Sequence, residues 1–484
     1  MMGKDQTSWA AQEFEEVNLG DKRLNARLVK LCDRFSEAPE SPINQACVDW
    51  AETKAAYRFF QNENVEVGQI MEAHRLQTTH RAKQHRMILA IQDTSYFVYT
   101  SHPKTTGLGK MSLKKGKNIA KIYSNGLMVH TCLAVSTEGL PLGLLDQKIF
   151  SRKLRSEKTR KGKSFRPQDH LPVEEKESYR WLETLANTKQ VIGDVDVVAV
   201  CDREADLYDF FKLSRQINAP VLVRANADRT INRNSRYAEK DVEKLWEHMR
   251  RQPKAGSYTI DIPMRSKTKH CEERSSRTAT VTVRFGSIRL NPPRNNIKHR
   301  AEPLPDIEMN AIYVLEQSPP DGEEPVEWML LTNLPVTSFD EAFEKVRWYC
   351  LRWRIEMFFK VLKSGFRVEA CRLGQADRLA RYLTIMSIVA WRLFMITLIA
   401  RTNPATPCST LLADNEWKVL FLKANRNKTV PKKPPRIGDV VIWVAKLGGY
   451  LARKSDGPPG TIALWRGWKR LADLTEGWNL AVQA

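Results

Sequence analysis

Two acidic side chains stand directly after apolar runs that are typical of buried strands. The run MILAIQ ends at Asp93, and the run VVAVC ends at Asp202. A carboxylate is uncommon there because Asp is disfavoured in strands and costly to bury without a partner. Either aspartate alone is also explained as a turn or capping residue. Glu204 and Asp206 compete with Asp202 as nearby acids, and Asp206 could instead cap the following helix.

A third acid lies in Trp348–Phe366, a segment with the apolar spacing of a helix. At the helical period, one tyrosine, one acid and three bases share an arc of about 80°. An ordinary amphipathic helix turns such a stripe to solvent, and that explanation stays open. The tyrosine and the flanking aromatics favour a helix that lies over a sheet edge with its stripe facing a site. The stripe consists of Tyr349, Arg352, Glu356, Lys360 and Lys363.

Together these acids suggest metal-dependent phosphoryl transfer. Two strand-end aspartates and a helix glutamate are suited to two Mg²⁺ ions, which prefer carboxylate and water oxygens. Paired ions stabilise the attacking and leaving oxygens of a phosphoryl displacement. The bases beside the glutamate would bind the flanking phosphates. We therefore expect Asp93, Asp202 and Glu356 to be catalytic and metal-binding residues beside a nucleic acid backbone.

The overall charge agrees with such a partner. The chain has 484 residues, room for two to four domains, and a formal net charge of +21,. This excess indicates nucleic acid or an anionic membrane surface. The first thirty residues do not resemble a signal peptide. Tyr382–Ala400 is long enough to span a membrane, but Arg392 in its middle would cost roughly 2.5–3.5 kcal/mol on insertion. We expect a core helix, no membrane contact and a cytoplasmic protein.

Other site classes are disfavoured by the sequence. Eight cysteines are scattered without a CxxC pair, which is typical of reduced, buried thiols,. The isolated pair His270–Cys271 does not suggest a metal site. No GxxxxGK[ST] phosphate loop is present, so a nucleotide-driven motor is unsupported,.

Four regions differ in composition. Residues 1–66 predict short helices, and Asp21 is a candidate N-cap of the second,. In that helix four bases share one face, which is either a solvated surface or a nucleic-acid contact; they are Arg23, Arg27, Lys30 and Arg34. From 86 to 226, apolar runs alternate with helices and predict a mixed sheet covered on both faces.

The next two regions are a β-rich block and a helical end. Residues 229–334 predict antiparallel strands, with TATVTVRF and SIRLN as separate strands,. Beyond 403 a Lys/Pro-rich linker leads into a tryptophan-rich helical end. The basic, apolar-poor segment Ser151–Arg166 predicts a mobile loop.

In its N-terminal region and around its three acids, the chain resembles the DDE transposases of bacterial insertion sequences, and more narrowly the insertion-sequence-four family. LGDKRLNARL and AAYRFFQN resemble its N-terminal DNA-binding domain, and VVAVCDREAD resembles its second-aspartate motif. Its Y-x2-R-x3-E-x6-K signature is reproduced by Tyr349, Arg352, Glu356 and Lys363. The resemblance implies an α/β, RNase H-like core at 67–402 with a β-rich insertion at about 229–334. It also implies a DNA-binding domain at 1–66 and a C-terminal dimerisation domain at 403–484.

The resemblance also implies roles for single residues. Trp328 corresponds to a tryptophan that stacks on a flipped base, although a strand tryptophan in a small core is the alternative. Tyr349 is expected to position rather than attack. At KRLNAR the sequence departs from the family, because Leu24 replaces a base. The implied DNA contacts are Arg23, Arg27 and Arg58 at the element ends, and Arg224, Tyr349, Arg352, Lys360 and Lys363 near the cleavage site.

The implied reaction is cut-and-paste transposition with two Mg²⁺ ions, for which Mn²⁺ can substitute. A water cuts one strand at each inverted-repeat end, the freed 3′-hydroxyl forms a hairpin on the opposite strand, and the opened ends join double-stranded target DNA. Family members act as homodimers through C-terminal helices, and the tail tryptophans fit either pairing or packing within one chain; these are Trp443, Trp465, Trp468 and Trp478. The alternatives are a catalytically silent DNA-binding repressor or domesticated regulator, and a nuclease that cuts without joining.

Overall fold

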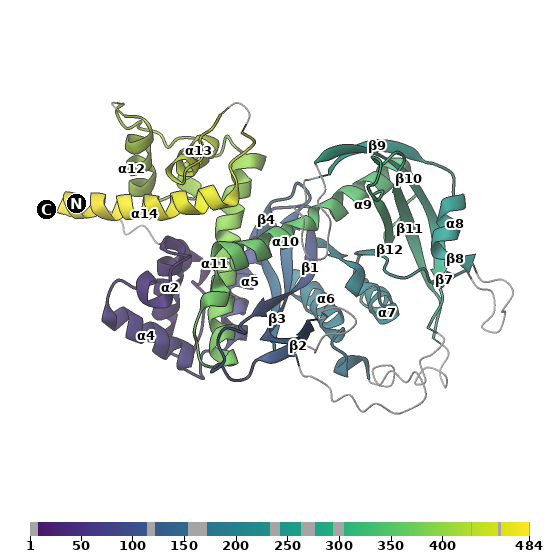
Figure 1. The fold of residues 1–484 in the computed structure, drawn as a ribbon, viewed down its shortest axis with the longest axis horizontal. Helices are drawn as coiled ribbons and strands as arrows, with labels where there is room; N and C mark the ends of the chain where they lie inside the picture. The colour runs from purple at the N-terminus through teal and green to yellow at the C-terminus, as the bar shows by residue number, and fades with distance from the viewer. Residues whose placement is uncertain are drawn as a thin grey trace. The chain divides into compact units, whose positions relative to one another are not determined.

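The computed structural model (Figure 1) describes residues 8–113, 122–152, 172–232, 243–262, 276–293, 304–426, 428–453 and 456–483. They form two compact units. The first unit is Met1–Arg86, Thr94–Ser156 and Arg354–Ala484, and the second is Met87–Asp93 and Glu157–Trp353. Strand β1 (Met87–Val98) contributes to both units. The segment predicted as a basic loop lies almost wholly outside the described residues, as does the pair His270–Cys271.

The second unit is a sheet with helices on both faces. Its hydrogen-bonded strand order is β1-β5-β6-β12-β11-β10-β7-β8, with β9 also on β10. Strands β1, β5 and β6 are parallel, and the later pairs are antiparallel. The elements are α6 (Tyr179–Ile192), β5 (Asp196–Cys201), α7 (Tyr208–Gln216), β6 (Val221–Arg224), β7 (Thr230–Ile231), β8 (Glu243–Lys244), α8 (Leu245–Arg251), β9 (Gly256–Ile262), β10 (Arg277–Leu290), β11 (Ile307–Glu316), β12 (Glu327–Thr332) and α9 (Phe339–Leu351).

Burial in this unit follows the sequence pattern. The parallel strands are buried along nearly their whole length, because helices cover both faces,. On one face α6 and α7 bury Trp181, Phe210 and Phe211 against the strands. On the other face α9 packs Phe343 against Tyr258 of β9 at a ring distance of 4.6 Å. The predicted mixed sheet and the predicted antiparallel block are both observed.

One strand prediction was wrong. The segments TATVTVRF and SIRLN form the single strand β10 rather than two strands joined by a turn. Gly286 lies between them and stays in the ladder, opposite Ala311 of β11. Glycine permits a turn but does not impose one, and an unbroken partner strand supplies hydrogen bonds on both sides of it.

The first unit is mainly helical. Its strands β2 (Gly109–Leu113) and β4 (Pro141–Phe150) both pair with β3 (Ile122–Ser136). The predicted N-cap is confirmed, because the Asp21 carboxylate accepts a hydrogen bond from the Arg23 backbone N–H at 2.8 Å. The helices are α1 (Trp9–Glu13), α2 (Lys22–Glu37), α3 (Ile43–Ala46), α4 (Trp50–Gln61), α5 (Val67–Ala82), α10 (Trp353–Lys360), α11 (Ala376–Thr402), α12 (Asp414–Ala424), α13 (Ile437–Leu447) and α14 (Thr461–Gln483).

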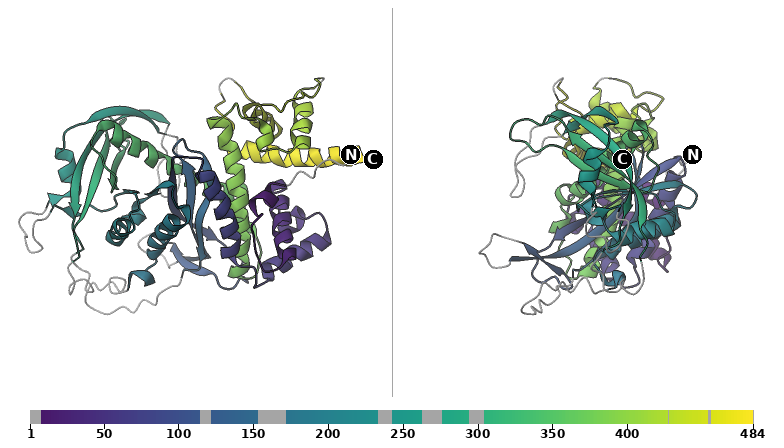
Figure 2. Two further views of the ribbon diagram at one scale, coloured as in Figure 1. Left: turned by 180° about the vertical axis from the view of Figure 1, so that it is seen from behind. Right: turned by 90° about the vertical axis from the view of Figure 1, so that its right-hand side faces the viewer.

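The long helix α11 is the central helix of this unit (Figure 2) and packs against α2, α4, α5 and α13. It is long and apolar enough to cross a membrane, but 78% of its most apolar window is buried inside the protein, as in a core helix. Arg392 within it lies over the Trp9 ring at 4.7 Å and donates to the Leu411 carbonyl at 3.2 Å. Burial lowers the pKa of Arg392 to about 10, although Glu416, Glu13 and Asp33 oppose this effect.

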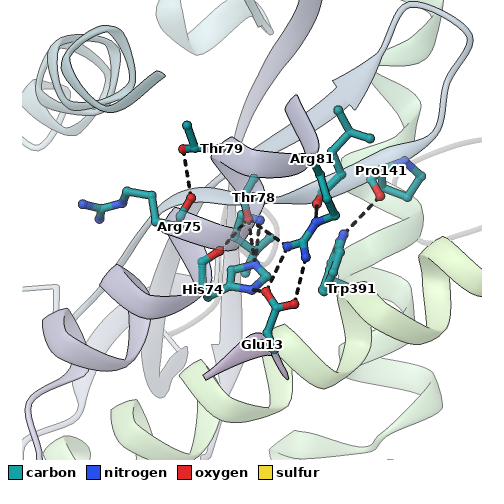
Figure 3. Close-up of polar contacts among 10 residues, drawn as sticks. Glu13, His74, Arg75, Thr78, Thr79, Arg81, Pro141 and Trp391 are labelled. Carbon is teal, nitrogen blue, oxygen red and sulfur yellow. Dashed lines mark hydrogen bonds and ion pairs between the residues drawn. The ribbon is translucent and has the colours of Figure 1, made fainter. Parts of the chain in front are cut away.

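A buried polar network joins α1 to α5 (Figure 3). The Glu13 carboxylate lies 2.6 Å from His74 Nδ1 and accepts two hydrogen bonds from Arg81 at 2.8 and 2.9 Å. His74 Nε2 accepts a hydrogen bond from the Leu144 backbone N–H of β4, so that nitrogen carries no proton. Arg81 also stacks over Trp391 of α11 at 4.3 Å. The network therefore fixes the first helix to the centre of the unit.

Replacing Glu13 by Gln is expected to destabilise the protein by about 3 kcal/mol, because it leaves the partly buried Arg81 cation without its counter-ion. Burial raises the pKa of Glu13, but His74 and Arg81 outweigh burial and bring the pKa to about 2. A depressed carboxyl pKa stabilises the fold above the ordinary value near 4.5 and loses this effect as the pH falls toward 2,. Chemical denaturation at several pH values measures both effects.

The matched control is Glu16→Gln, at an exposed position just beyond α1. It should leave stability and its pH dependence unchanged. A Glu13→Gln stability loss that stays constant from pH 7 to pH 3 would contradict the role of the ionised carboxylate.

Candidate active site

The sheet register places the two strand-end aspartates side by side. Strands β1 and β5 run parallel, with Met87 opposite Asp196 and Gln92 opposite Cys201. The next residues along both strands are Asp93 and Asp202, so they are neighbours at the same end of adjacent strands, which lie about 4.8 Å apart. Two acids that are 109 positions apart in the sequence are therefore neighbours at one end of the sheet.

Side-chain alternation sets the face on which they lie. Cys201, Val223 and Met329 belong to the core under α6 and α7. Successive side chains on a strand point to opposite faces, so the next or preceding residues point toward the α9 face. On β6 and β12 these residues are Arg224 and Trp328, and Asp202 follows Cys201 in extended backbone. The catalytic candidates of this unit therefore share the face that α9 covers.

Helix α9 supplies the cation for the first aspartate. Arg352, at its C-terminal end, forms an ion pair with Asp93, with Nη1 3.3 Å from Oδ2. Both side chains are mostly buried, with exposed fractions of 15% and 17%. Two neighbouring carboxylates repel each other unless a cation lies close. Arg352 therefore places a cation directly beside Asp93.

Tyr349 connects the remaining groups. Its hydroxyl accepts a hydrogen bond from Arg224, and its ring meets the half-buried Trp328 edge-on at 5.7 Å. Burial and Asp202 raise the pKa of Tyr349, whereas Arg352 and Arg224 lower it, with burial the largest effect. A protonated, buried hydroxyl suits positioning rather than nucleophilic attack. Trp328 lies on the face opposite the core under α6 and α7.

The third acid lies just after the boundary between the units. Glu356 is in the first turn of α10, one helical turn after Arg352, which keeps helical backbone angles. Lys360 ends α10 and is exposed. Lys363 lies in a π-helical turn, Val361–Gly365, so the regular helical phase predicted for it does not hold. This turn is packed under Trp465, whose ring leaves no room for a side chain at Gly365.

Lys363 is anchored within the first unit. Its ammonium donates to the Tyr96 carbonyl at 2.8 Å and lies 5.0 Å from the centre of the Phe97 ring. Both partners belong to β1, three and four residues after Asp93. The lysine therefore ties the helical segment after Glu356 to the strand that carries the first aspartate.

The donor chemistry fits a divalent ion. Asp93 and Asp202 offer the carboxylate oxygens that Mg²⁺ prefers. In the part of the chain that the structure describes, no group of three or more His, Cys, Asp or Glu side chains is arranged to hold a metal ion. The structure thus pairs the two aspartates in the second unit without assembling three acids around one point.

The rival acids near Asp202 have other partners. Asp202 itself caps the short 3-10 helix Arg203–Ala205 by accepting from the Glu204 N–H at 2.8 Å. The Glu204 side chain is 61% exposed and pairs with Arg180. Asp206 does not cap α7, contrary to one sequence interpretation, because the N-cap position is Leu207 and no side chain caps it.

The N-terminal bases divide into two groups. Lys30 and Arg34 pair with Glu52 of α4, so the predicted basic stripe is partly neutralised. Arg23 is 91% exposed and pairs only locally with Asp21 among the described residues. Within the described ranges Arg27 and Arg58 form no ion pair.

Helix α4 adds exposed aromatics that the sequence analysis missed. Trp50 is 76% exposed and Tyr57 is 43% exposed. With Lys54 they follow the i, i+4, i+7 spacing of one helical face, opposite Phe59 and Phe60 in the core,. This spacing was the available signal. Exposed aromatics interleaved with cations are typical of nucleic-acid surfaces.

The C-terminal tryptophans mostly pack within the chain. Trp443 meets Phe421 at 5.7 Å, and Trp465 meets Phe366 at 6.0 Å. Trp468 borders the core of α12–α14. Trp478 on α14 is 43% exposed, and Leu480 and Val482 beyond it are 63% and 69% exposed. An apolar end of α14 is therefore left uncovered.

Three family models match consecutive parts of the chain. Residues 6–65 match a transposase DNA-binding domain, residues 175–392 match a transposase DDE domain, and residues 388–483 match the dimerisation domain of Tn5 transposase.

Among solved structures, the cryo-EM piggyBac transposase synaptic complex with hairpin DNA matches at 9% identity and a TM-score of 0.31. The match covers 80% of this chain and 59% of that chain, so this protein spans less than two thirds of its length. A similarity this low carries no argument.

The three family models occur in the order DNA-binding domain, DDE domain and Tn5-type dimerisation domain. The signature from Tyr349 to Lys363 lies inside the DDE match, and the paired aspartate Asp202 lies there too. The chain therefore belongs to the DDE transposases of the insertion-sequence-four family and is similar to the transposase of Tn5.

Proposed function

We propose that this protein is a cut-and-paste DNA transposase whose active site consists of Asp93, Asp202 and Glu356. The observation that carries the proposal is the β1–β5 register, which makes two carboxylates neighbours on one face of the sheet. Glu356 supports it because Arg352, one helical turn before Glu356, forms an ion pair with Asp93. A pure DNA-binding protein gains nothing from acids clustered beside phosphates.

The proposed core is RNase H-like. Strand β1 is hydrogen-bonded to β5, and β6 follows, while β3 and β4 form an antiparallel pair in the first unit. Strands β7–β12 come between β6 and α9, as expected of a β-rich insertion before the catalytic helix. We propose the domains 1–66, 67–402 and 403–484 on the same basis.

The three acids would hold two Mg²⁺ ions, or Mn²⁺ in their place. When bound, these ions stabilise negative charge on the attacking and leaving oxygens of the phosphate. The chain's own residues orient the DNA around them. Arg224 and Arg352 bind the phosphates beside the scissile one, and Tyr349 holds both guanidinium groups in place,. Lys360 and Lys363 extend this contact along the backbone.

The reaction would begin with hydrolysis of one strand at each inverted-repeat end. The freed 3′-hydroxyl then attacks the opposite strand to give a hairpin, which a second water opens, and the ends join target DNA. A base must leave the stack for the tight hairpin bend, and the half-buried Trp328 face would receive it,. No covalent protein–DNA intermediate is needed, in agreement with a protonated Tyr349.

The proposed partners are double-stranded DNA and a second copy of the chain. The face of α2 and α4 would bind the element ends through Arg23, Arg27 and Arg58. The uncovered apolar end of α14 suits pairing with another copy in the DNA-bound dimer. A basic, DNA-binding chain without a membrane role would act in the cytoplasm, at the nucleoid.

Glu356→Gln is expected to bind element ends normally but to cut them at least a hundredfold more slowly in Mg²⁺, because an amide is a weak ligand for this ion. Gel assays of binding in Ca²⁺ and of cleavage in Mg²⁺ measure the two steps. The control is Glu344→Gln, on the preceding helix α9 with its side chain 52% exposed. Normal cleavage by the Glu356 variant would remove it from the site, and an inactive wild-type protein would favour the repressor function.

Trp328→Ala is expected to slow hairpin formation about tenfold more than first-strand nicking, because stacking on a flipped base is worth about 1–3 kcal/mol. Denaturing gels of end-labelled DNA separate the nicked, hairpin and opened species. Trp328→Phe keeps an aromatic face and should lose less. Equal losses in both steps would contradict the stacking role.

Trp50→Ala is expected to weaken binding of element ends about tenfold without changing the salt slope, since stacking is not a charge contact. Lys54→Ala should lower the slope of log K against log salt by about one. Lys254→Ala, at an exposed position in the second unit, serves as the charge control. Unchanged binding by both α4 variants would exclude this face as the DNA contact.

A further inference from the structure

The DREAD motif contains a second aspartate that the proposed chemistry does not use. The Asp206 side chain is completely buried, whereas that of Glu204 in the same motif is 61% exposed. A buried carboxylate is strongly destabilising unless charges and hydrogen bonds surround it. Its partners therefore indicate which part of the structure it holds.

Among the described residues, the partners of the Asp206 carboxylate lie in the segment just after β6. Oδ2 accepts hydrogen bonds from the backbone N–H groups of Asn226 at 2.8 Å and Ala227 at 3.3 Å. Oδ1 forms a close ion pair with Arg229, which also donates to the Asp206 carbonyl at 3.1 Å. The Arg229 guanidinium lies over the Phe211 ring of α7 at 5.8 Å. The carboxylate thus closes a clamp around residues 226–229.

This clamp begins two residues after Arg224. Arg224 ends β6 and donates through Nη2 to the Glu327 carbonyl at 3.0 Å. The next residue, Ala225, donates its N–H to the Met329 carbonyl at 2.8 Å. These two bonds flank Trp328 on β12. The end of β6 is therefore held on one side by β12 and on the other by Asp206.

The clamp also has a fixed relation to the second aspartate of the site. Asp202 and Asp206 are separated only by the 3-10 helix Arg203–Ala205, whose first turn Asp202 caps. A shift of the segment after β6 would displace Asp206, and with it the short helix that Asp202 caps. Asp202 is thus linked to the chain that follows Arg224 through residues 203–206 and the Asp206 carboxylate.

We propose that Asp206 is a positioning residue that holds Arg224 in place relative to Asp202. It touches neither DNA nor metal. Its carboxylate fixes the chain after β6 so that the Arg224 guanidinium meets Tyr349 and, in the complex, a phosphate. The assignment of Arg224 to a phosphate rests on the proposed function, whereas the clamp itself rests only on the contacts of the free protein.

A double-mutant cycle tests this role. Asp206→Asn keeps an oxygen for the two backbone N–H groups but removes the charge that holds Arg229. We expect DNA-end cleavage in Mg²⁺ to fall about tenfold in this variant, and to fall no further when it is added to Arg224→Ala. Glu204→Gln, at the exposed acid of the same motif, should retain cleavage within about twofold. A thermal unfolding curve of each variant shows whether the variant is folded at the assay temperature.

A purely structural role predicts a different result. In that case Asp206→Asn lowers cleavage by the same factor in the wild-type and Arg224→Ala backgrounds, and the proposal is overturned. Unchanged cleavage by Asp206→Asn also overturns it. If the Asn variant is unfolded, Arg229→Lys replaces it, because lysine keeps the charge but loses the planar guanidinium whose Nη2 contacts both Oδ1 and the backbone carbonyl of Asp206,.

The proposed function can fail separately from the clamp. Limited trypsin digestion of the DNA-free protein reads the clamp directly, with no cleavage activity needed. Asp206→Asn should expose the peptide bond after Arg229 to cutting, and Glu204→Gln should not. A wild-type protein that is inactive on DNA, together with faster digestion of Asp206→Asn, would reject the transposase chemistry and keep the clamp. Equal digestion of both variants would reject the clamp.

Discussion

Two carboxylates at equivalent positions of adjacent parallel strands are the constraint on which the proposed active site depends. Main-chain hydrogen bonds fix the register of β1 on β5 along six residue pairs. This register makes Asp93 and Asp202 neighbours independently of the loop conformations. Like charges this close raise the free energy of the fold unless cations accompany them. The same arrangement that is unfavourable in the free protein is what a divalent ion requires. The repulsion between the two carboxylates explains the arginines that surround them.

Helix α9 and the residue that follows it supply the cation that reduces this repulsion. Arg352 neutralises Asp93, and Tyr349 links Arg224, Arg352 and Trp328 into one contact network. The mixed-charge stripe predicted on a largely apolar helix begins with Tyr349 and Arg352, which lie over the sheet. Ala342, Val346 and Trp348 of α9 are buried, and Arg352 at its C-terminal end pairs with Asp93. Its solvent-facing alternative does not hold for Tyr349, which is only 6% exposed.

Charge is used differently in the two units. In the first unit Glu13, His74 and Arg81 form a closed set of mutual hydrogen bonds around a helix junction, which is a stabilising arrangement. In the second unit Asp206 and Arg229 form a similar closed pair. Asp93, by contrast, pairs with the Arg352 side chain at the end of helix α9. A carboxylate with a replaceable side-chain partner can exchange it for a ligand, whereas Glu13 and Asp206 cannot do so without loss of structure.

Local patterns in the sequence determined much of this protein. The apolar runs before Asp93 and Asp202 predicted strands, the spacing from Tyr349 to Lys363 predicted a helix face, and Asp21 predicted a helix cap; each depends on residues within a few positions of one another. The tertiary structure decided the features that depend on residues far apart in the sequence. Gly286 remained in one long strand because β11 continued opposite it, and Lys363 lay in a π-helical turn whose Gly365 packs against the distant Trp465. Lys30 and Arg34 were neutralised by Glu52, and Asp206 clamped the chain after β6 rather than capping α7. These outcomes could not be read from the sequence, because the free energy of each side chain depends on charges and packing that only the folded chain brings close.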